Sequence, residues 1–141
     1  MFFRHSPVLW RGLGLWRQGR KFAFISIYAP SQYEPDFFPN LNTVLSHLQD
    51  FSLIIGADMN TCVNLALDKS LQQSTSTQLR ASRDLNNFLS SLSLSDLYRT
   101  INPTFKQYTF YSARHQTFSR IDYLLNYILL FGAFLAHRCW I

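Results

Sequence analysis

The sequence predicts a mixed α/β fold, and three features of its patterning indicate this class. Two short apolar runs, at residues 22–29 and 51–55, are rich in β-branched and aromatic residues, which is typical of buried strands. A pattern with the spacing of an amphipathic helix lies between them, at residues 37–49. A strand, a helix and a strand at this spacing form a crossover unit, so the two strands should share one sheet.

The first half of the chain holds these elements in order. Residues 1–20 show no clean periodicity and are predicted to be irregular, apart from a short strand near residues 8–10. The run at residues 22–29 is apolar throughout, so we predict a strand that is buried on both faces. Asp36 is the expected N-cap of the helix that follows, and Pro39 falls in its first turn, where proline is tolerated.

The second half begins with a polar segment, residues 60–77, that predicts a long surface loop. Apolar residues at helical spacing then predict a helix over residues 80–92, followed by an irregular segment to residue 103. The alternating segments 108–111 and 118–124 are expected to pair as a hairpin. The apolar stretch 124–136 predicts a helix that is too short to cross a bilayer, since about twenty residues are needed.

Composition limits the class of protein. The chain has 141 residues, of which 48% are hydrophobic, 16% aromatic and 15% charged. This length suits one domain, and so high an apolar content excludes an intrinsically disordered chain. The charged fraction is low, which indicates an extensive core, an exposed apolar face, or a fragment whose partner segments should cover that face.

Charge and cysteine content limit the partners and the compartment. The net charge of +5 favours polyanions such as nucleic acid. Cys62 and Cys139 are too few for a disulfide scaffold, and we expect no disulfide partner. Arginines interrupt every apolar run before residue 21, so no signal peptide and no membrane association are expected. We therefore expect an intracellular protein of the nucleus or cytoplasm.

The segment at residues 53–61 carries the most chemical information. An apolar strand ends in Gly56 and then presents Asp58 and Asn60, whose side chains point to the same side of an extended backbone. A carboxylate at the carboxyl end of such a strand can deprotonate water or help to hold Mg²⁺, and an amide can hold a phosphoryl oxygen. The alternative is a simple turn, because Asp and Asn are common turn residues.

Two further segments bear on this choice. Tyr28 ends the first apolar strand, and Ser119, Arg120 and Asp122 interrupt a later strand that is otherwise apolar. An aspartate buried in such a strand is costly unless it is paired. Asp122 is therefore either part of a site or the partner of a structural hydrogen bond to a neighbouring loop.

Together these segments resemble one family, the endonuclease/exonuclease/phosphatase superfamily. The matching phrases are Tyr-Ala-Pro at residues 28–30, Gly-Ala-Asp-Met-Asn at 56–60, Tyr-Thr-Phe-Tyr-Ser at 108–112 and Ser-Arg-Ile-Asp at 119–122. Within the superfamily they are most similar to the apurinic-type endonuclease domain of LINE retrotransposon second open reading frames. The connecting phrases at residues 67–70 and 96–103 match that group too, and the resemblance covers roughly residues 20–124.

The resemblance implies a partial four-layer α/β sandwich, with two facing mixed sheets flanked by helices. It also implies Mg²⁺-dependent hydrolysis of a DNA phosphodiester by water. In this role Asp58 would be the base and a weak metal ligand, Asn60 and Tyr28 would hold the phosphate, and Asp122 would orient a histidine. The DNA contacts that it implies fall in and around the hairpin, at Thr109, Arg114, His115, Ser119 and Arg120.

The sequence departs from the family pattern near both ends. The 27 residues before Tyr28 contain no glutamate for the metal site, and Glu34 comes too late in the chain to replace it. No Ser-Asp-His motif follows residue 124, and none of His5, His47 and His137 is placed to substitute for it. The expected organisation is a divergent segment at residues 1–20, a partial domain at 21–124 and a divergent apolar tail at 125–141.

Two functional hypotheses stay open at this point. The chain is either a divergent phosphodiesterase whose missing groups come from a partner, or a non-catalytic remnant of a retrotransposon endonuclease that retains DNA affinity. The missing glutamate and histidine favour the second hypothesis, with weak or no nicking of DNA. The order of the motifs disfavours a third, an unrelated α/β interaction module.

Overall fold

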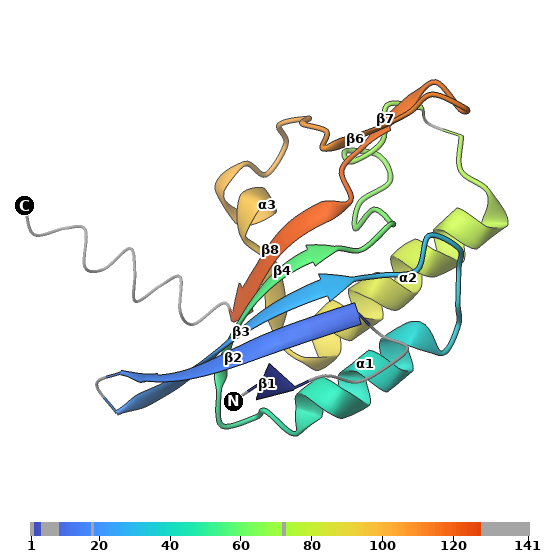
Figure 1. Ribbon diagram of the computed structural model, residues 1–141. Coiled ribbons are helices and arrows are strands. Elements are labelled where there is room, and N and C mark those ends of the chain that lie inside the picture. The colour runs from blue at the N-terminus through green and yellow to red at the C-terminus, as the bar shows by residue number, and fades with distance from the viewer. Residues whose placement is uncertain (1, 4–8, 18, 72, 128–141) are drawn as a thin grey trace, which may run out of the picture.

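A single mixed sheet organises the molecule. The computed structural model describes residues 2–3, 9–17, 19–71 and 73–127 (Figure 1). Six strands pair in the order β1-β2-β3-β4-β8-β5, and β6 and β7 form a separate hairpin. The strands are β1 (Phe2–Phe3), β2 (Leu9–Arg17), β3 (Arg20–Tyr28), β4 (Ser52–Asp58), β5 (Leu94–Asp96), β6 (Phe110–Ser112), β7 (Thr117–Ser119) and β8 (Asp122–Tyr127). The predicted α/β class is confirmed.

The crossover unit predicted from the sequence is present. Strands β3 and β4 are parallel neighbours, and helix α1 (Phe37–Ser46) connects them. Asp36 is the N-cap residue by position, but its side chain makes no capping hydrogen bond. A second helix, α2 (Ser76–Ser91), begins with a capping box in which Thr75 and Gln78 exchange side-chain and backbone hydrogen bonds. This cap moves the start of the helix four residues ahead of the predicted one.

The core lies between the sheet and the two longer helices. Helices α1 and α2 pack along the same face of the sheet (Figure 1). Alternate side chains of each strand point to this face, because successive residues of a strand point to opposite sides. The most deeply buried residues of this core are Leu41, Leu45, Leu53, Ile55, Leu85 and Leu125.

The other face of the sheet is open, which corrects one prediction. The strand at residues 22–29 was expected to be buried on both faces, but β3 alternates between buried and exposed positions along its length. Phe24 is 41% exposed and Tyr28 is 52% exposed, while their neighbours Ile25 and Ile27 are buried. A continuous apolar run therefore does not require cover on both sides in this chain.

The N-terminal segment also differs from the prediction. Residues 9–17 form β2, which pairs in register with the whole of β3. Just before β3, Gly19 has a φ of +75°, a conformation that favours glycine. The segment shows no strand periodicity of its own, because two glycines and two arginines interrupt it. Pairing with β3 makes it a strand.

Three smaller differences occur in the second half. The predicted strand 118–124 is two strands, since β7 belongs to the hairpin and β8 to the main sheet. The segment 96–103, expected to be irregular, contains the short helix α3 (Leu97–Ile101), and β5 comes directly before this helix. Residues 124–127 belong to β8 and not to a helix, and the rest of the predicted apolar tail lies outside the described residues.

No helix in the described part of the chain is long and apolar enough to cross a membrane. Cys62 is a buried free thiol, and Cys139 lies outside the described residues. Burial raises the pKa of the Cys62 thiol to about 11, so the group is inert at neutral pH. The domain boundaries at residues 20 and 124 stay predictions.

Candidate functional site

Three of the predicted site residues lie side by side at one end of the sheet. Tyr28 is the register partner of Asp58 across β3 and β4, and Asp58 is the partner of Asp122 across β4 and β8. Register partners point to the same face, which here is the open one. Asp122 was expected to be buried, but it is exposed. Its neighbour Tyr123 points to the buried face of β8, so Asp122 points to the open one.

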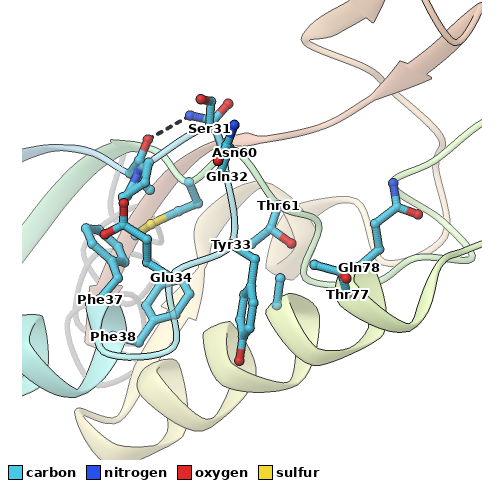
Figure 2. A pocket seen from close by; sticks show the side chains of 14 residues that line it. Ser31, Gln32, Tyr33, Glu34, Phe37, Phe38, Asn60, Thr61, Thr77 and Gln78 are labelled. Atoms are coloured by element: carbon cyan, nitrogen blue, oxygen red, sulfur yellow. Dashed lines mark hydrogen bonds between the residues drawn. The ribbon is translucent and has the colours of Figure 1, made fainter.

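Asn60 is fixed directly beyond this row. Its φ of +48° is in the left-handed region, which asparagine tolerates better than most residues. The Asn60 amide N–H donates to Asp58 Oδ1 at 3.0 Å. Asn60 Nδ2 donates to the carbonyl oxygen of Ala29 at 2.7 Å, which is the dashed line in Figure 2. The turn therefore links Asn60 to Asp58 through its backbone amide and to the end of β3 through its carboxamide.

The electrostatics of the row favour a positive partner. Burial raises the pKa of Asp58, the carboxylate of Asp122 raises it further, and the hydrogen bond from the Asn60 amide partly opposes both effects. Within the described part of the chain no ion pair reaches Asp58 or Asp122. Such a pair of carboxylates gains from a proton or a cation.

Thr109 holds the start of β8 in place. Its hydroxyl Oγ1 accepts hydrogen bonds from the amides of Ile121 and Asp122, at 3.2 and 3.3 Å. The amide of Met59 in turn donates to the carbonyl oxygen of Ile121 at 2.8 Å. Thr109 was predicted to contact DNA, and in the structure it is also a positioning residue for Asp122. The alternating pattern of residues 108–111 did not indicate this second role.

A groove of about 750 Å³ is lined by Asn60 and not by the three residues of the row. The 60–75 loop, the start of α2 and the β6–β7 hairpin form its walls, and it brings Asn60 together with His115 and Ser119 from the hairpin. Lys69 also lines it and was not predicted from the sequence. The Lys69 side chain is buried, and its Nζ donates to the carbonyl oxygen of Gln73 at 2.6 Å and to Gln78 Oε1 at 2.9 Å. Thr109 and Arg114 do not line the groove.

Solved structures with the same arrangement of elements decide the fold. An AP endonuclease from Leishmania major matches with a TM-score of 0.69 at 16% identity, over 86% of this chain and 46% of that one. The endonuclease domain of the telomere-specific non-LTR retrotransposon TRAS1 matches with a TM-score of 0.60 at 16% identity, over 87% and 52%. The chain therefore has the same fold as these endonuclease structures over the part that it covers.

A third structure of this fold is described as the 3′ phosphatase NExo from Neisseria bound to a product DNA hairpin. It matches with a TM-score of 0.55 at 18% identity, over 84% of this chain and 52% of that one. The chain therefore spans about half the length of the solved structures that it resembles. No protein-family model matches the sequence.

The described residues do not offer a complete metal site. Among the described residues, no three His, Cys, Asp or Glu side chains are grouped to hold a metal ion. Mg²⁺ is usually bound through one or two carboxylates together with substrate phosphates and water. Asp58 and Asp122 are such a pair, but they do not fit a metal that is held before the substrate arrives.

Arg120 was expected to contact DNA, but it lies in the interior of the protein. It is 2% exposed, and its guanidinium donates to Asp68 Oδ1 from Nε at 2.9 Å and to Asp96 Oδ2 from Nη2 at 2.5 Å. Burial alone would lower the pKa of Arg120, but these two carboxylates raise it above its ordinary value. Asp68 is fully buried and also pairs with Arg99. A guanidinium engaged in this way is not free to bind a backbone phosphate.

The hairpin, by contrast, presents its side chains to solvent. Tyr111 and Phe118 are about half exposed, with ring centroids 4.6 Å apart, and Tyr108 stacks on Phe118 at 6.0 Å. Arg114 and His115 are exposed where the hairpin turns. Aromatic and basic groups of this kind are suited to contact bases and phosphates.

Proposed function

We propose that this chain binds DNA through the AP-endonuclease-type end of its sheet and hydrolyses phosphodiesters weakly or not at all. The observation that carries the proposal is the row of Tyr28, Asp58 and Asp122, with Asn60 beside it, in register across three strands and without a third acidic ligand. The binding half of a nuclease site is assembled, and the half that drives the chemistry is incomplete.

The DNA-binding half follows from the groove and the hairpin. Asn60 and Tyr28 would hold a phosphate at the end of the sheet, since an amide and a phenol both donate to phosphoryl oxygens. Ser119 and His115 would contact the strand that runs along the groove, and Arg114 would pair with a phosphate on the hairpin side. The net charge of +5 supports the same partner.

The catalytic half lacks two contributions. Asp58 has the geometry of a general base, and its raised pKa suits proton acceptance from water. Asp122, however, has no contact with a histidine in the described part of the chain, where His47 lies at the end of α1 and His115 on the hairpin. A metal and a charge-stabilising donor each supply several kcal/mol of transition-state stabilisation, so a chain without both would hydrolyse a phosphodiester more slowly by many orders of magnitude.

A second candidate is a working nuclease that receives its missing groups from a partner chain. The carboxylates of Asp58 and Asp122 favour it, because they form no ion pair among the described residues and would gain from a cation that a partner helps to hold. A tight Mg²⁺ site in the purified chain, measured by calorimetry, would support this candidate against the first.

DNA binding tests the proposal directly. Fluorescence anisotropy with a labelled duplex should show binding that weakens steeply with salt, and Arg114→Ala should reduce the slope of log K against log salt by about one unit. The matched control is Arg83→Ala, on the exposed face of α2 and away from the groove. Binding that is insensitive to salt, or equally weakened by both changes, would contradict a DNA contact at the hairpin.

A further inference from the structure

The β6–β7 hairpin has two different faces. The groove is lined by alternate residues of its two strands, Phe110, Ser112, Thr117 and Ser119. Successive residues of a strand point to opposite sides, so Tyr111 and Phe118, which do not line the groove, lie on the other, outer face. The hairpin is a sheet of its own and extends past the end of the main sheet (Figure 1). Its outer face is therefore not part of the open face of the main sheet.

Aromatic side chains gather at this outer face. Tyr111 and Phe118 are register partners across the hairpin, with ring centroids 4.6 Å apart. Tyr108 stacks on Phe118, with the two ring planes 28° apart. Tyr111 is 49% exposed and Phe118 is 48% exposed, so each ring contacts its neighbour and still presents about half of its surface to solvent. An aromatic surface of this kind is suited to stacking against another flat ring.

The backbone of Phe118 is held on both edges of its strand. Its amide donates to Ser70 Oγ at 3.0 Å, and its carbonyl oxygen accepts from the Ser70 amide at 3.0 Å. Strand β6 pairs along the opposite edge. A ring on a backbone that is fixed in this way loses little conformational freedom when a ligand stacks on it, so the aromatic surface is preorganised for binding.

The charge around the hairpin suits a polyanion. The sequence has no acidic residue between Asp96 and Asp122, and this segment contains the whole hairpin. Lys106 and Arg114, which lie within it, are exposed. The segment therefore combines exposed cations with exposed aromatic rings, which are the two features by which proteins bind single-stranded nucleic acid.

We propose that the outer face of the hairpin stacks on unpaired bases, so that the chain binds DNA with a single-stranded segment more tightly than a continuous duplex. The inference rests on the proposed function, because the paired part of the same DNA would lie in the groove on the other face of the hairpin. Bases within a duplex are stacked on one another, whereas an unpaired base has a free face. Every base has such a face, so the preference should not depend on sequence.

Fluorescence anisotropy with two labelled DNAs tests the proposal. One is a blunt duplex, and the other is the same duplex with a single-stranded overhang of about ten nucleotides, a length typical of single-strand binding sites. We expect the overhang to raise the affinity about tenfold, an increase that one stacked base can supply. Tyr111→Leu keeps an apolar contact with Phe118 but removes the aromatic ring, and should abolish most of this increase. Tyr111→Phe should retain it, as should the matched control Phe24→Leu, at an aromatic residue of similar exposure on β3.

Stacking can also be observed directly. The fluorescent base 2-aminopurine, placed in the overhang, should be quenched when the chain binds, and quenched much less by Tyr111→Leu. If the rings only stabilise the hairpin, Tyr111→Leu would weaken binding to both DNAs by the same factor, and this result would overturn the proposal. Equal affinity of the chain for the two DNAs would overturn it too, while leaving the proposed function intact. Absence of salt-dependent binding to either DNA would contradict the proposed function, and this inference with it.

Discussion

Two groups of carboxylates in this molecule lie in opposite environments. Asp68 and Asp96 are buried, and both pair with Arg120. Asp68 also pairs with Arg99, so the four side chains form one cluster. Asp58 and Asp122 lie on the open face of the sheet without an ion pair among the described residues. The first group satisfies its charge internally and stabilises the fold. The second leaves its charge unsatisfied, which is typical of residues that act on a ligand.

The two groups are linked through the backbone. Arg120 lies two residues before Asp122, and its amide donates to the carbonyl oxygen of Asp68 at 2.8 Å. The buried cluster thus anchors the 60–70 loop and the start of β8, on which the open pair depends. The comparison predicts that changes in the first group act on stability, and that changes in the second act on binding and on pH dependence.

The largest expected effect is on the buried cluster. Arg120→Met leaves Asp68 and Asp96 without their shared cation, and breaking such a buried pair costs about 3–5 kcal/mol in the free energy of unfolding. Urea denaturation followed by circular dichroism measures the loss. The control, Arg114→Met on the exposed hairpin turn, should change stability by less than about 0.5 kcal/mol. Equal stability of the two variants would show that the cluster is not structural.

A smaller loss of stability is expected from a change at Thr109, which holds the backbone between the buried cluster and Asp122. Thr109→Val keeps the shape of the side chain but removes the acceptor for the amides of Ile121 and Asp122, which costs about 1–2 kcal/mol. Faster amide hydrogen exchange at Asp122 should accompany the loss. Thr104→Val, at an exposed loop position, is the control. Unchanged exchange at Asp122 would mean that Thr109 does not position β8.

A change at Asp122, one of the two carboxylates on the open face, should alter the affinity for DNA more than the free energy of unfolding. In the absence of divalent metal, Asp122→Asn removes a negative charge beside the proposed phosphate position and should strengthen DNA binding about two- to fivefold. Anisotropy titrations with EDTA measure this, with Asp50→Asn in the exposed loop before β4 as the control. Weaker binding by Asp122→Asn would indicate that the carboxylate binds DNA through a cation.

The smallest effect is a pH dependence of stability. Because the pKa of Asp58 is raised above its ordinary value of 3.8, the folded state holds the proton more tightly than the unfolded state. Stability should therefore fall as pH rises from that value through the raised pKa, and should level off above it. Asp58→Asn should remove this slope, as seen in chemical denaturation at a series of pH values. A slope that survives in Asp58→Asn would assign it to another group.

The sequence predicted the elements that carry their own periodicity. The strand–helix–strand unit of β3, α1 and β4 is confirmed, because apolar spacing alone specifies a buried face. Strand β2 was missed, because it becomes a strand only through its pairing with β3. The break between β7 and β8 was missed for a similar reason. Arg120 turns inward there to meet Asp68, a contact between residues far apart in the chain.

The residue types of the candidate site could be predicted from the sequence, but whether each side chain is buried or exposed could not. Asp58 and Asn60 follow from a strand that ends in glycine and a turn, and the structure joins them by a hydrogen bond. Local sequence does not distinguish an exposed Asp122 from a buried Arg120 two residues earlier. That difference arises at the break between β7 and β8, where Arg120 lies outside both strands and turns toward Asp68, while Asp122 begins β8 on its exposed face. Lys69 carried no signal, since its burial depends on the start of α2.

The central claim is that this chain keeps the DNA-binding half of an AP-endonuclease-type site without an effective catalytic half. Nicking of supercoiled plasmid in the presence of Mg²⁺, compared between the purified chain and Asp58→Ala, tests it most directly. We predict that DNA is bound under the same conditions and that nicking by the chain does not exceed that of Asp58→Ala. Robust Mg²⁺-dependent nicking that Asp58→Ala abolishes would contradict the account.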